Sequence, residues 1–216
     1  MSDSTPSHAK LAAAASFSSP FAAHTAHEHP TRDGLVQVRL HAERLASVTL
    51  ISTWMGGTQA LCAALGQALA ATDLFPLPAA TGQTAQCPLG LLLRTGPHEF
   101  MLIGSGTADA LGALQAHITS DIGALLDLSH ARCRVHIEGP HAVTTLGKLF
   151  ALDFREAAFA VGQLQLSGHH HVPCSLHRLG AESFDLYLLS TYAHGQLESL
   201  QDAALEYGVA LTIAHA

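Results

Sequence analysis

The 216-residue chain has few charged side chains and very few basic ones. Charged residues make up 12% of the sequence, and only Lys10 and Lys148 among its ten basic residues are lysines. With a formal net charge of -7, the sequence offers no basic surface of the kind that binds nucleic acid or an anionic membrane. Its partners are therefore expected to be proteins or small molecules. The scarcity of charge, together with a mean hydropathy of +0.25, favours a subunit whose apolar face is covered by another chain.

Signals of several other protein classes are also absent. No apolar run reaches the length of about eighteen residues that a membrane-spanning helix needs. The apolar stretch after Lys10 is interrupted by Ser16 and Pro20, so it does not resemble a signal peptide, and we expect a cytoplasmic location. Neither G-x-G-x-x-G nor G-x-x-x-x-G-K-[ST] occurs, which removes the usual phosphate-binding loops for dinucleotides and nucleoside triphosphates.

The four cysteines form no C-x-x-C pair. Cys62, Cys87, Cys133 and Cys174 lie far apart, which argues against a zinc ribbon or a redox pair. The sequence therefore predicts reduced, mostly buried thiols.

Histidine, in contrast, is abundant, with sixteen copies. The densest group is His169-His-His171, followed by Cys174 and His177. Imidazole and thiolate bind zinc and copper, but neighbouring side chains of an extended segment point in opposite directions. We favour a solvated histidine loop and assign no metal ligand, with a metal site as the alternative.

Asp127, Ser129 and His130 are the residue types of a hydrolytic triad. In four consecutive residues of extended chain, however, Asp127 and Ser129 share one face and His130 takes the other. The pattern favours a polar turn in which Asp127 and Ser129 bond to local backbone amides.

The amino-acid composition of the chain changes near residue 34. Residues 1–33 are rich in Ser, Ala, His and Pro and predict a flexible or partner-wrapping arm, in which Phe17 and Phe21 are candidate partner contacts. Beyond the arm we predict a first α+β unit over 34–121 and a second over 122–216. The predicted strands cover 36–40, 46–53, 89–94, 99–103, 124–137, 175–179 and 183–188, and the predicted helices 58–71, 108–118, 140–150 and 192–207.

The two units share a sequence pattern at an offset of 84 residues. Five identities fall within eleven positions of two predicted hairpins: Leu92 with Leu176, Arg94 with Arg178, Gly96 with Gly180, Phe100 with Phe184, and Leu102 with Leu186. This spacing indicates a duplicated strand-helix-strand-strand-helix unit with mainly antiparallel sheets.

The segment that runs from Asp127-Leu-Ser-His-Ala-Arg132 through Gly139-Pro140 to Asp153-Phe154 resembles the aminomethyltransferase (glycine-cleavage T-protein) fold. Further segments make the chain more similar to gamma subunits of heterotetrameric sarcosine oxidase. These are Gly96-Pro-His-Glu-Phe-Met-Leu102, His177-Arg-Leu-Gly180, Phe184-Asp-Leu-Tyr187, Ser190-Thr-Tyr-Ala193 and Glu206-Tyr-Gly208.

The chain departs from the catalytic members of this superfamily. Catalytic T-proteins have a Gly-Gly-Ile-x-Asp-Asp type of segment before Arg-Leu-Gly, and counting back from Arg178 puts Val172 and Pro173 at the acidic positions. The iron-sulfur repair branch has a cysteine where this chain reads Phe159-Ala-Val-Gly-Gln-Leu164. Val172 and Pro173 cannot accept a proton, so we predict no catalytic and no cofactor-binding residue in this chain.

The resemblance implies a non-catalytic gamma subunit of a complex with alpha, beta and delta chains, alpha being the main contact. Such a complex demethylates sarcosine to glycine oxidatively and passes the one-carbon unit to tetrahydrofolate, with FAD, FMN, NAD, folate and zinc held by the partner subunits. Arg132 and Arg134 share a strand face and are expected to meet a partner's acidic rim, although they could also bind a carboxylate or phosphate or pair with Glu138. Two alternatives stay open. One is the gamma subunit of an N-methylglutamate or dimethylglycine oxidoreductase, and the other is a stand-alone folate-binding protein.

Overall fold

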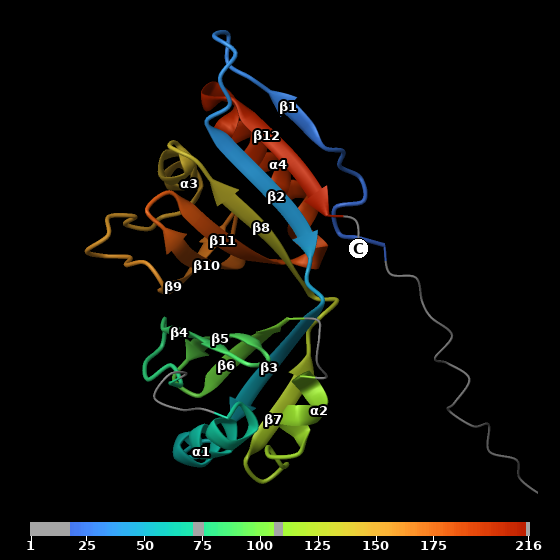
Figure 1. Cartoon of the computed structure of the whole chain (residues 1–216), viewed down its shortest axis with the longest axis vertical. Helices are drawn as coiled ribbons and strands as arrows, with labels where there is room; N and C mark the ends of the chain where they lie inside the picture. Colours follow the sequence, from blue (N-terminus) through green and yellow to red (C-terminus); the bar gives the residue numbers. More distant parts are fainter. Residues whose placement is uncertain (1–17, 71–75, 106–109, 215–216) are drawn as a thin grey trace, which may run out of the picture.

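The computed structural model describes residues 18–70, 76–105 and 110–214, and it contains two β-sheets, each covered by two helices (Figure 1). The seven-stranded sheet has the order β1 (His27–His29), β12 (Val209–Ala214), β2 (Val38–Arg44), β8 (Arg132–Glu138), β11 (Ser183–Leu189), β10 (Val172–Gly180) and β9 (Leu164–His169). The five-stranded sheet has the order β4 (Thr84–Cys87), β5 (Gly90–Gly96), β6 (Glu99–Gly104), β3 (Ser47–Thr53) and β7 (Gly123–Asp127).

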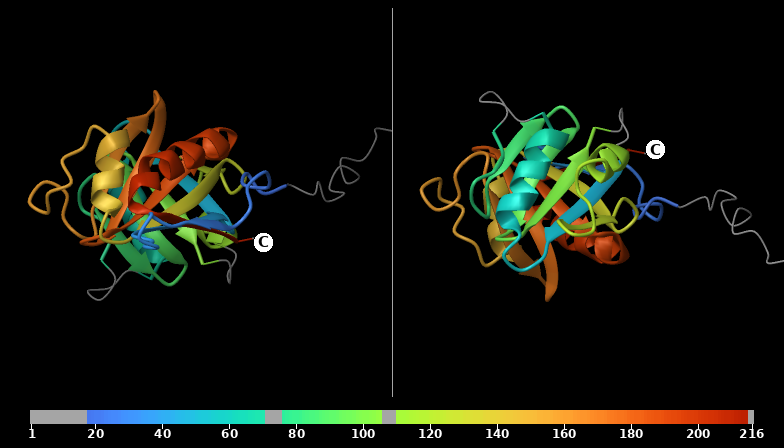
Figure 2. Two further views of the ribbon diagram at one scale, coloured as in Figure 1. Left: turned by 90° about the horizontal axis from the view of Figure 1, so that it is seen from above. Right: turned by 90° about the horizontal axis from the view of Figure 1, so that it is seen from below.

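The two pairs of helices lie on opposite sides of the molecule: α3 and α4 are in front when it is seen from above, and α1 and α2 when it is seen from below (Figure 2). They are α1 (Thr58–Ala68), α2 (Ala110–Gln115), α3 (Ala142–Leu149) and α4 (Ala193–Ala204), and short 3-10 turns flank α4 at Ser190–Tyr192 and Leu205–Tyr207. All sheet pairings are antiparallel among the described strands except the parallel pair of β12 and β2. The predicted α+β class with mainly antiparallel sheets is confirmed.

Strand alternation explains how each sheet acquires its core. In β8, Cys133, Val135 and Ile137 are fully buried under α3 and α4, while the residues between them point to the other face. In the five-stranded sheet, residues such as Ile51 and Phe100 are buried under α1 and α2 in the same way. A third, smaller apolar cluster joins the inner faces of the two sheets and contains Leu45, Val48, Leu93, Met101, Ile103, Leu164 and Tyr187.

The two sequence repeats exchange their first strands. β2, which was predicted in the first unit, pairs with β8 in the seven-stranded sheet, and β7, predicted in the second unit, pairs with β3 in the five-stranded sheet. The links that follow these strands carry Leu45 and Leu128, and both leucines pack into the cluster between the sheets. At these two links the chain passes between the sheets. The sheets therefore do not coincide with the predicted units 34–121 and 122–216.

The two repeated hairpins have the same irregularity at equivalent positions. The register shifts between Leu93 and Gly96 in the pair of β5 and β6, and between Arg178 and Gly180 in the pair of β10 and β11. The repeats also meet at an isolated bridge between Gln83 and Gln163. The hairpin identities found in the sequence therefore mark a real structural repeat.

The N-terminal segment differs from the predicted arm over its described residues. Phe21 is fully buried in the core of the seven-stranded sheet, so it is not available as the predicted partner contact. His24 lies 2.8 Å from His194 of α4, between their ring nitrogens, and His27 lies 2.7 Å from the Gln201 amide. The segment thus packs on its own chain. Phe17, the other predicted contact, lies outside the described residues.

Other boundaries also differ from the sequence prediction. The predicted strand over 124–137 is two strands separated by a turn, and β1, β4, β9 and β12 were not predicted. The helix predicted over 192–207 is α4 with its flanking 3-10 turns. Residue 71, the predicted end of the first helix, and residues 108–109, the predicted start of the second, lie outside the described residues.

Candidate functional site between the two sheets

A pocket of about 190 Å³ opens between the inner faces of the two sheets. The five-stranded sheet contributes one wall with Leu50, Thr95, Glu99 and Met101. The seven-stranded sheet contributes the opposite wall with Arg132, Leu166, Ser167, Pro173, Cys174, Ser175 and Tyr187. Apolar walls with a few polar groups are typical of a small-molecule site.

Arg132 is the cation of this pocket. It is the first residue of β8, and its half-buried side chain lies on the inner face of the sheet. Burial lowers the pKa of its guanidinium, whereas the negative charge of Glu99 raises it. Within the described part of the chain, Arg132 forms no ion pair with N and O atoms 4.0 Å or less apart. The guanidinium therefore faces the pocket with donors that the surrounding residues leave for a ligand.

Glu99 is the carboxylate of the pocket, and our sequence reasoning missed it. The Thr95 hydroxyl donates a hydrogen bond of 2.6 Å to Glu99 Oε1, which fixes the carboxylate at the start of β6. The only sequence signal was its place in the segment Gly96-Pro-His-Glu-Phe, where it looked like an ordinary hairpin residue.

Val172 and Pro173 stand at the two positions where the resemblance to catalytic T-proteins led us to expect acids. Pro173 lines the pocket and Val172 precedes it at the start of β10. Neither side chain can transfer a proton. Of these two residues, Pro173 is the one that lines the pocket, and it brings no acid to it.

Arg134, the other arginine predicted at an interface, is held within its own chain. Its guanidinium is ion-paired with Glu43 and lies 3.2 Å from Asp185 Oδ2, and these two carboxylates raise its pKa against the effect of burial. Its Nε is buried without a hydrogen-bond partner among the described residues. Because two carboxylates already neutralise Arg134, it is poorly placed to meet a partner's acidic rim.

His136 extends the same network along β8. Its Nδ1 lies 2.8 Å from Asp185 Oδ1, and this hydrogen bond, more than any other influence, raises the pKa of His136. Tyr187 also reaches Asp185, at 3.5 Å. In this network the carboxylates of Glu43 and Asp185 are paired with Arg134 and His136 of the same chain.

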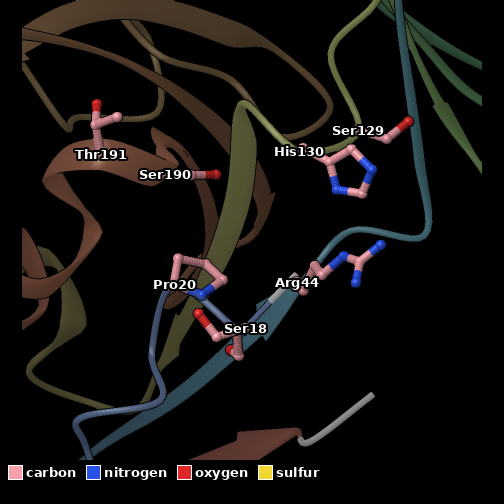
Figure 3. Close-up of a pocket in the computed structure, with 8 residues that line it drawn as sticks. Ser18, Pro20, Arg44, Ser129, His130, Ser190 and Thr191 are labelled. Carbon is pink, nitrogen blue, oxygen red and sulfur yellow. The ribbon is translucent and has the colours of Figure 1, made fainter. Parts of the chain in front are cut away.

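Ser129 and His130 line a second hollow of about 220 Å³ (Figure 3), and Asp127 is hydrogen-bonded to Ser129. Asp127 Oδ1 accepts hydrogen bonds from the backbone amide and the hydroxyl of Ser129, at 2.9 and 2.5 Å, and Ser129 Oγ accepts one from the Val48 amide at 3.0 Å. The hydroxyl of Ser129 therefore donates its proton to Asp127 within the turn. The predicted polar turn is confirmed for Asp127, whereas Ser129 accepts from the amide of Val48 in β3, which is distant in sequence.

The histidine group is spread over a hairpin. His170 and His171 are its two exposed turn residues, whereas His169 is buried against Phe150, with ring centroids 5.6 Å apart. His177 is buried 3.3 Å from the Thr84 hydroxyl. The predicted solvated loop is therefore wrong for His169 and His177. Among the described residues, no three His, Cys, Asp or Glu side chains are grouped as a metal site.

The four cysteines are free thiols, as predicted. Cys133 and Cys174 are buried, and burial raises the pKa of Cys133 to about 12. Cys62 and Cys87 are only partly buried. No described helix is both long and apolar enough to cross a membrane.

The arrangement of the two sheets defines the class of protein. The fold matches aminomethyltransferase T of the glycine cleavage system from Bartonella henselae, with a TM-score of 0.56 over 83% of this chain and 48% of that one, at 16% identity. A chain of the heterotetrameric sarcosine oxidase from Corynebacterium sp. U-96, solved with pyrrole 2-carboxylate, matches with a TM-score of 0.70 and 28% identity, over 88% of this chain and 95% of that one. The protein therefore has a T-protein-like fold.

Sequence comparison is more specific. The chain is 31% identical to the sarcosine oxidase subunit gamma of Corynebacterium sp. (strain U-96) over 144 residues, which are 66% of this chain and 70% of that subunit. It is 29% identical to the corresponding subunit of Arthrobacter sp., over 70% of this chain and 71% of the relative. No protein-family model matches. The chain belongs to the family of sarcosine oxidase gamma subunits.

Proposed function

We propose that this chain is a non-catalytic subunit of a heterotetrameric oxidase that demethylates sarcosine to glycine and passes the one-carbon unit to tetrahydrofolate. Its role is to complete the assembly by docking on the alpha chain, while the partner chains hold the flavins, NAD, folate and zinc. Support comes from membership of the gamma-subunit family and from the match to a chain of a heterotetrameric oxidase.

The observation that carries the non-catalytic role is the pair of residues at the start of β10. Where the catalytic relatives have acids, Val172 and Pro173 offer no group that accepts a proton. The remaining carboxylate, Glu99, comes from the hairpin of the first repeat and accepts a hydrogen bond from Thr95.

Exposed apolar side chains support a docking surface. Met55 is 99% exposed and the adjacent Trp54 is 54% exposed, at the turn between β3 and α1. A large apolar pair of this kind in water is typical of a surface that another protein covers.

The test is coexpression of the tagged chain with the alpha, beta and delta subunits. We expect all four chains to copurify with bound flavin, and the complex to reduce its flavin when sarcosine is added. The isolated chain should turn over no amine. Turnover by the isolated chain, or a chain that has no affinity for alpha, would contradict the proposal.

The same preparation separates the alternative functions. If N-methylglutamate or dimethylglycine reduces the flavin and sarcosine does not, the complex is a related oxidoreductase. Tight binding of tetrahydrofolate by the isolated chain would instead favour a stand-alone folate-binding protein.

A further inference from the structure

We propose that the pocket between the sheets binds a small zwitterion of the α-amino acid class, with Arg132 holding the carboxylate and Glu99 the ammonium group. This inference concerns the isolated chain and does not depend on the proposed role in an assembly.

The first argument is the separation of two opposite charges. Arg132 begins β8 on one wall of the pocket and Glu99 begins β6 on the other, and the two side chains interact through space without forming an ion pair. Opposite charges that face each other across a pocket leave room for a ligand that carries both signs. A singly charged ligand would satisfy one of them and be repelled by the other.

The second argument is the contrast with the neighbouring arginine. Arg134 lies two residues further along the same face of β8 and is bound by Glu43 and Asp185. The chain thus neutralises one arginine internally and leaves the guanidinium of Arg132 half-buried beside the pocket. A guanidinium can form two parallel hydrogen bonds with a carboxylate, which suits the acid group of an amino acid.

The third argument is the size and lining of the pocket. A volume of about 190 Å³ accommodates an amino acid with a small side chain. Leu50, Met101 and Pro173 surround the charged pair with apolar surface, which strengthens both charge interactions. Glu99 is fixed by its hydrogen bond from Thr95, so one of the two contacts is already oriented.

Calorimetric titration of the full-length chain with three probes tests the proposal. Glycine carries both charges, whereas acetate carries only the acid and methylammonium only the base. We expect the Kd for glycine to be at least about tenfold lower than for either single-charge probe, because each of these forfeits one charged contact.

Variants locate the site. Arg132→Gln and Glu99→Gln should each raise the Kd for glycine at least about tenfold. Arg155→Gln is the matched control, because Arg155 is exposed and pairs with Asp153 outside the pocket, and it should leave the Kd unchanged. Circular dichroism and thermal unfolding check that the variants fold. If one of the two pocket variants does not fold, the Kd of the other still tests the proposal.

Three results would overturn the proposal. One is acetate that binds as tightly as glycine, which would make this a plain anion site. Another is glycine binding that survives both Arg132→Gln and Glu99→Gln. The last is the absence of any glycine binding by the folded chain.

Discussion

At the scale of single residues, the repeated arginines Arg94 and Arg178 organise the two hairpins. Arg178 is buried and donates hydrogen bonds to the carbonyl oxygens of Phe154, Phe159, Gly180 and Ala181, at 2.7 to 3.1 Å. Arg94 binds four carbonyl oxygens in the same pattern, at Gly96, Pro78, Ala79 and Pro97. Each guanidinium also lies over the phenylalanine of its own hairpin, 5.1 or 5.3 Å from the ring centroid.

These contacts predict unequal effects of one substitution at two equivalent positions. Arg178→Ala should lower the free energy of unfolding by about 3 to 5 kcal/mol, because it leaves buried carbonyl oxygens without a donor. Arg94→Ala is the matched control and should cost about 1 to 2 kcal/mol, since water can replace a less buried guanidinium. Urea denaturation measures both, and equal losses would contradict this account.

Two histidines on the same sheet face should respond to pH in opposite directions. The hydrogen bond to Asp185 raises the pKa of His136, so its contribution to stability is complete below about pH 6.5 and is lost as the pH rises through the folded-state pKa. Burial lowers the pKa of His177, so its contribution is present above about pH 6.5 and is lost as the pH falls.

The measurement is the free energy of unfolding from pH 5 to pH 8 for His136→Gln and His177→Gln. The loss caused by His136→Gln should grow toward acid pH. Replacing His177 should instead make the protein less sensitive to acid. Parallel pH profiles for the two variants would refute the assigned shifts, whatever packing cost each substitution adds.

At the scale of elements, the hairpin of β9 and β10 has an unusual turn. His170 and His171 both have positive φ, 49° and 64°, and the flanking residues His169 and Val172 are paired. This conformation is the one that Asn-Gly adopts most easily in two-residue hairpins.

Replacing His170 by Asn and His171 by Gly should therefore stabilise the protein by about 1 kcal/mol, because the native turn becomes less strained. The double alanine variant is the control and should give no such gain, since alanine tolerates positive φ poorly. Thermal unfolding compares the two, and equal melting temperatures would argue against strain in this turn.

The sequence predicted elements well where the apolar pattern was strong and poorly where pairing alone defines a strand. β8 alternates buried and polar residues and was recognised, but β1 has only three residues and exists because it pairs with β12. The pocket was partly predictable. Arg132 and Pro173 were singled out from sequence, whereas Glu99 joins them only because the fold brings β6 opposite β8.

At the scale of the whole molecule, the exchange of β2 and β7 couples the two halves. A fragment of residues 18–121 lacks β7 and carries β2 without its partners, and a fragment of 122–216 has the converse defect. We expect neither fragment alone to unfold cooperatively, and we expect the two to associate when coexpressed.

A fragment of residues 47–127 provides the comparison, because it contains all five strands of one sheet. It should show more sheet signal by circular dichroism than the fragment of 18–121, although the latter is longer. Cooperative unfolding of the isolated 18–121 fragment would contradict the coupling.

The sequence repeat alone could not reveal this exchange. β2 pairs with β8 and β7 pairs with β3, so each strand joins the sheet formed by the other half of the chain. Leu45 and Leu128, which follow these strands, pack in the cluster between the sheets, so their contacts come from both halves of the chain. Long-range packing of this kind leaves no local signal.

The exchanged strands also bear on the ancestry of the chain. A protein made of one such repeat would have lacked the strand that completes its own sheet, and it would have obtained that strand from a second copy of itself. Duplication and fusion of the gene for such a homodimer would give one polypeptide with this exchange of strands.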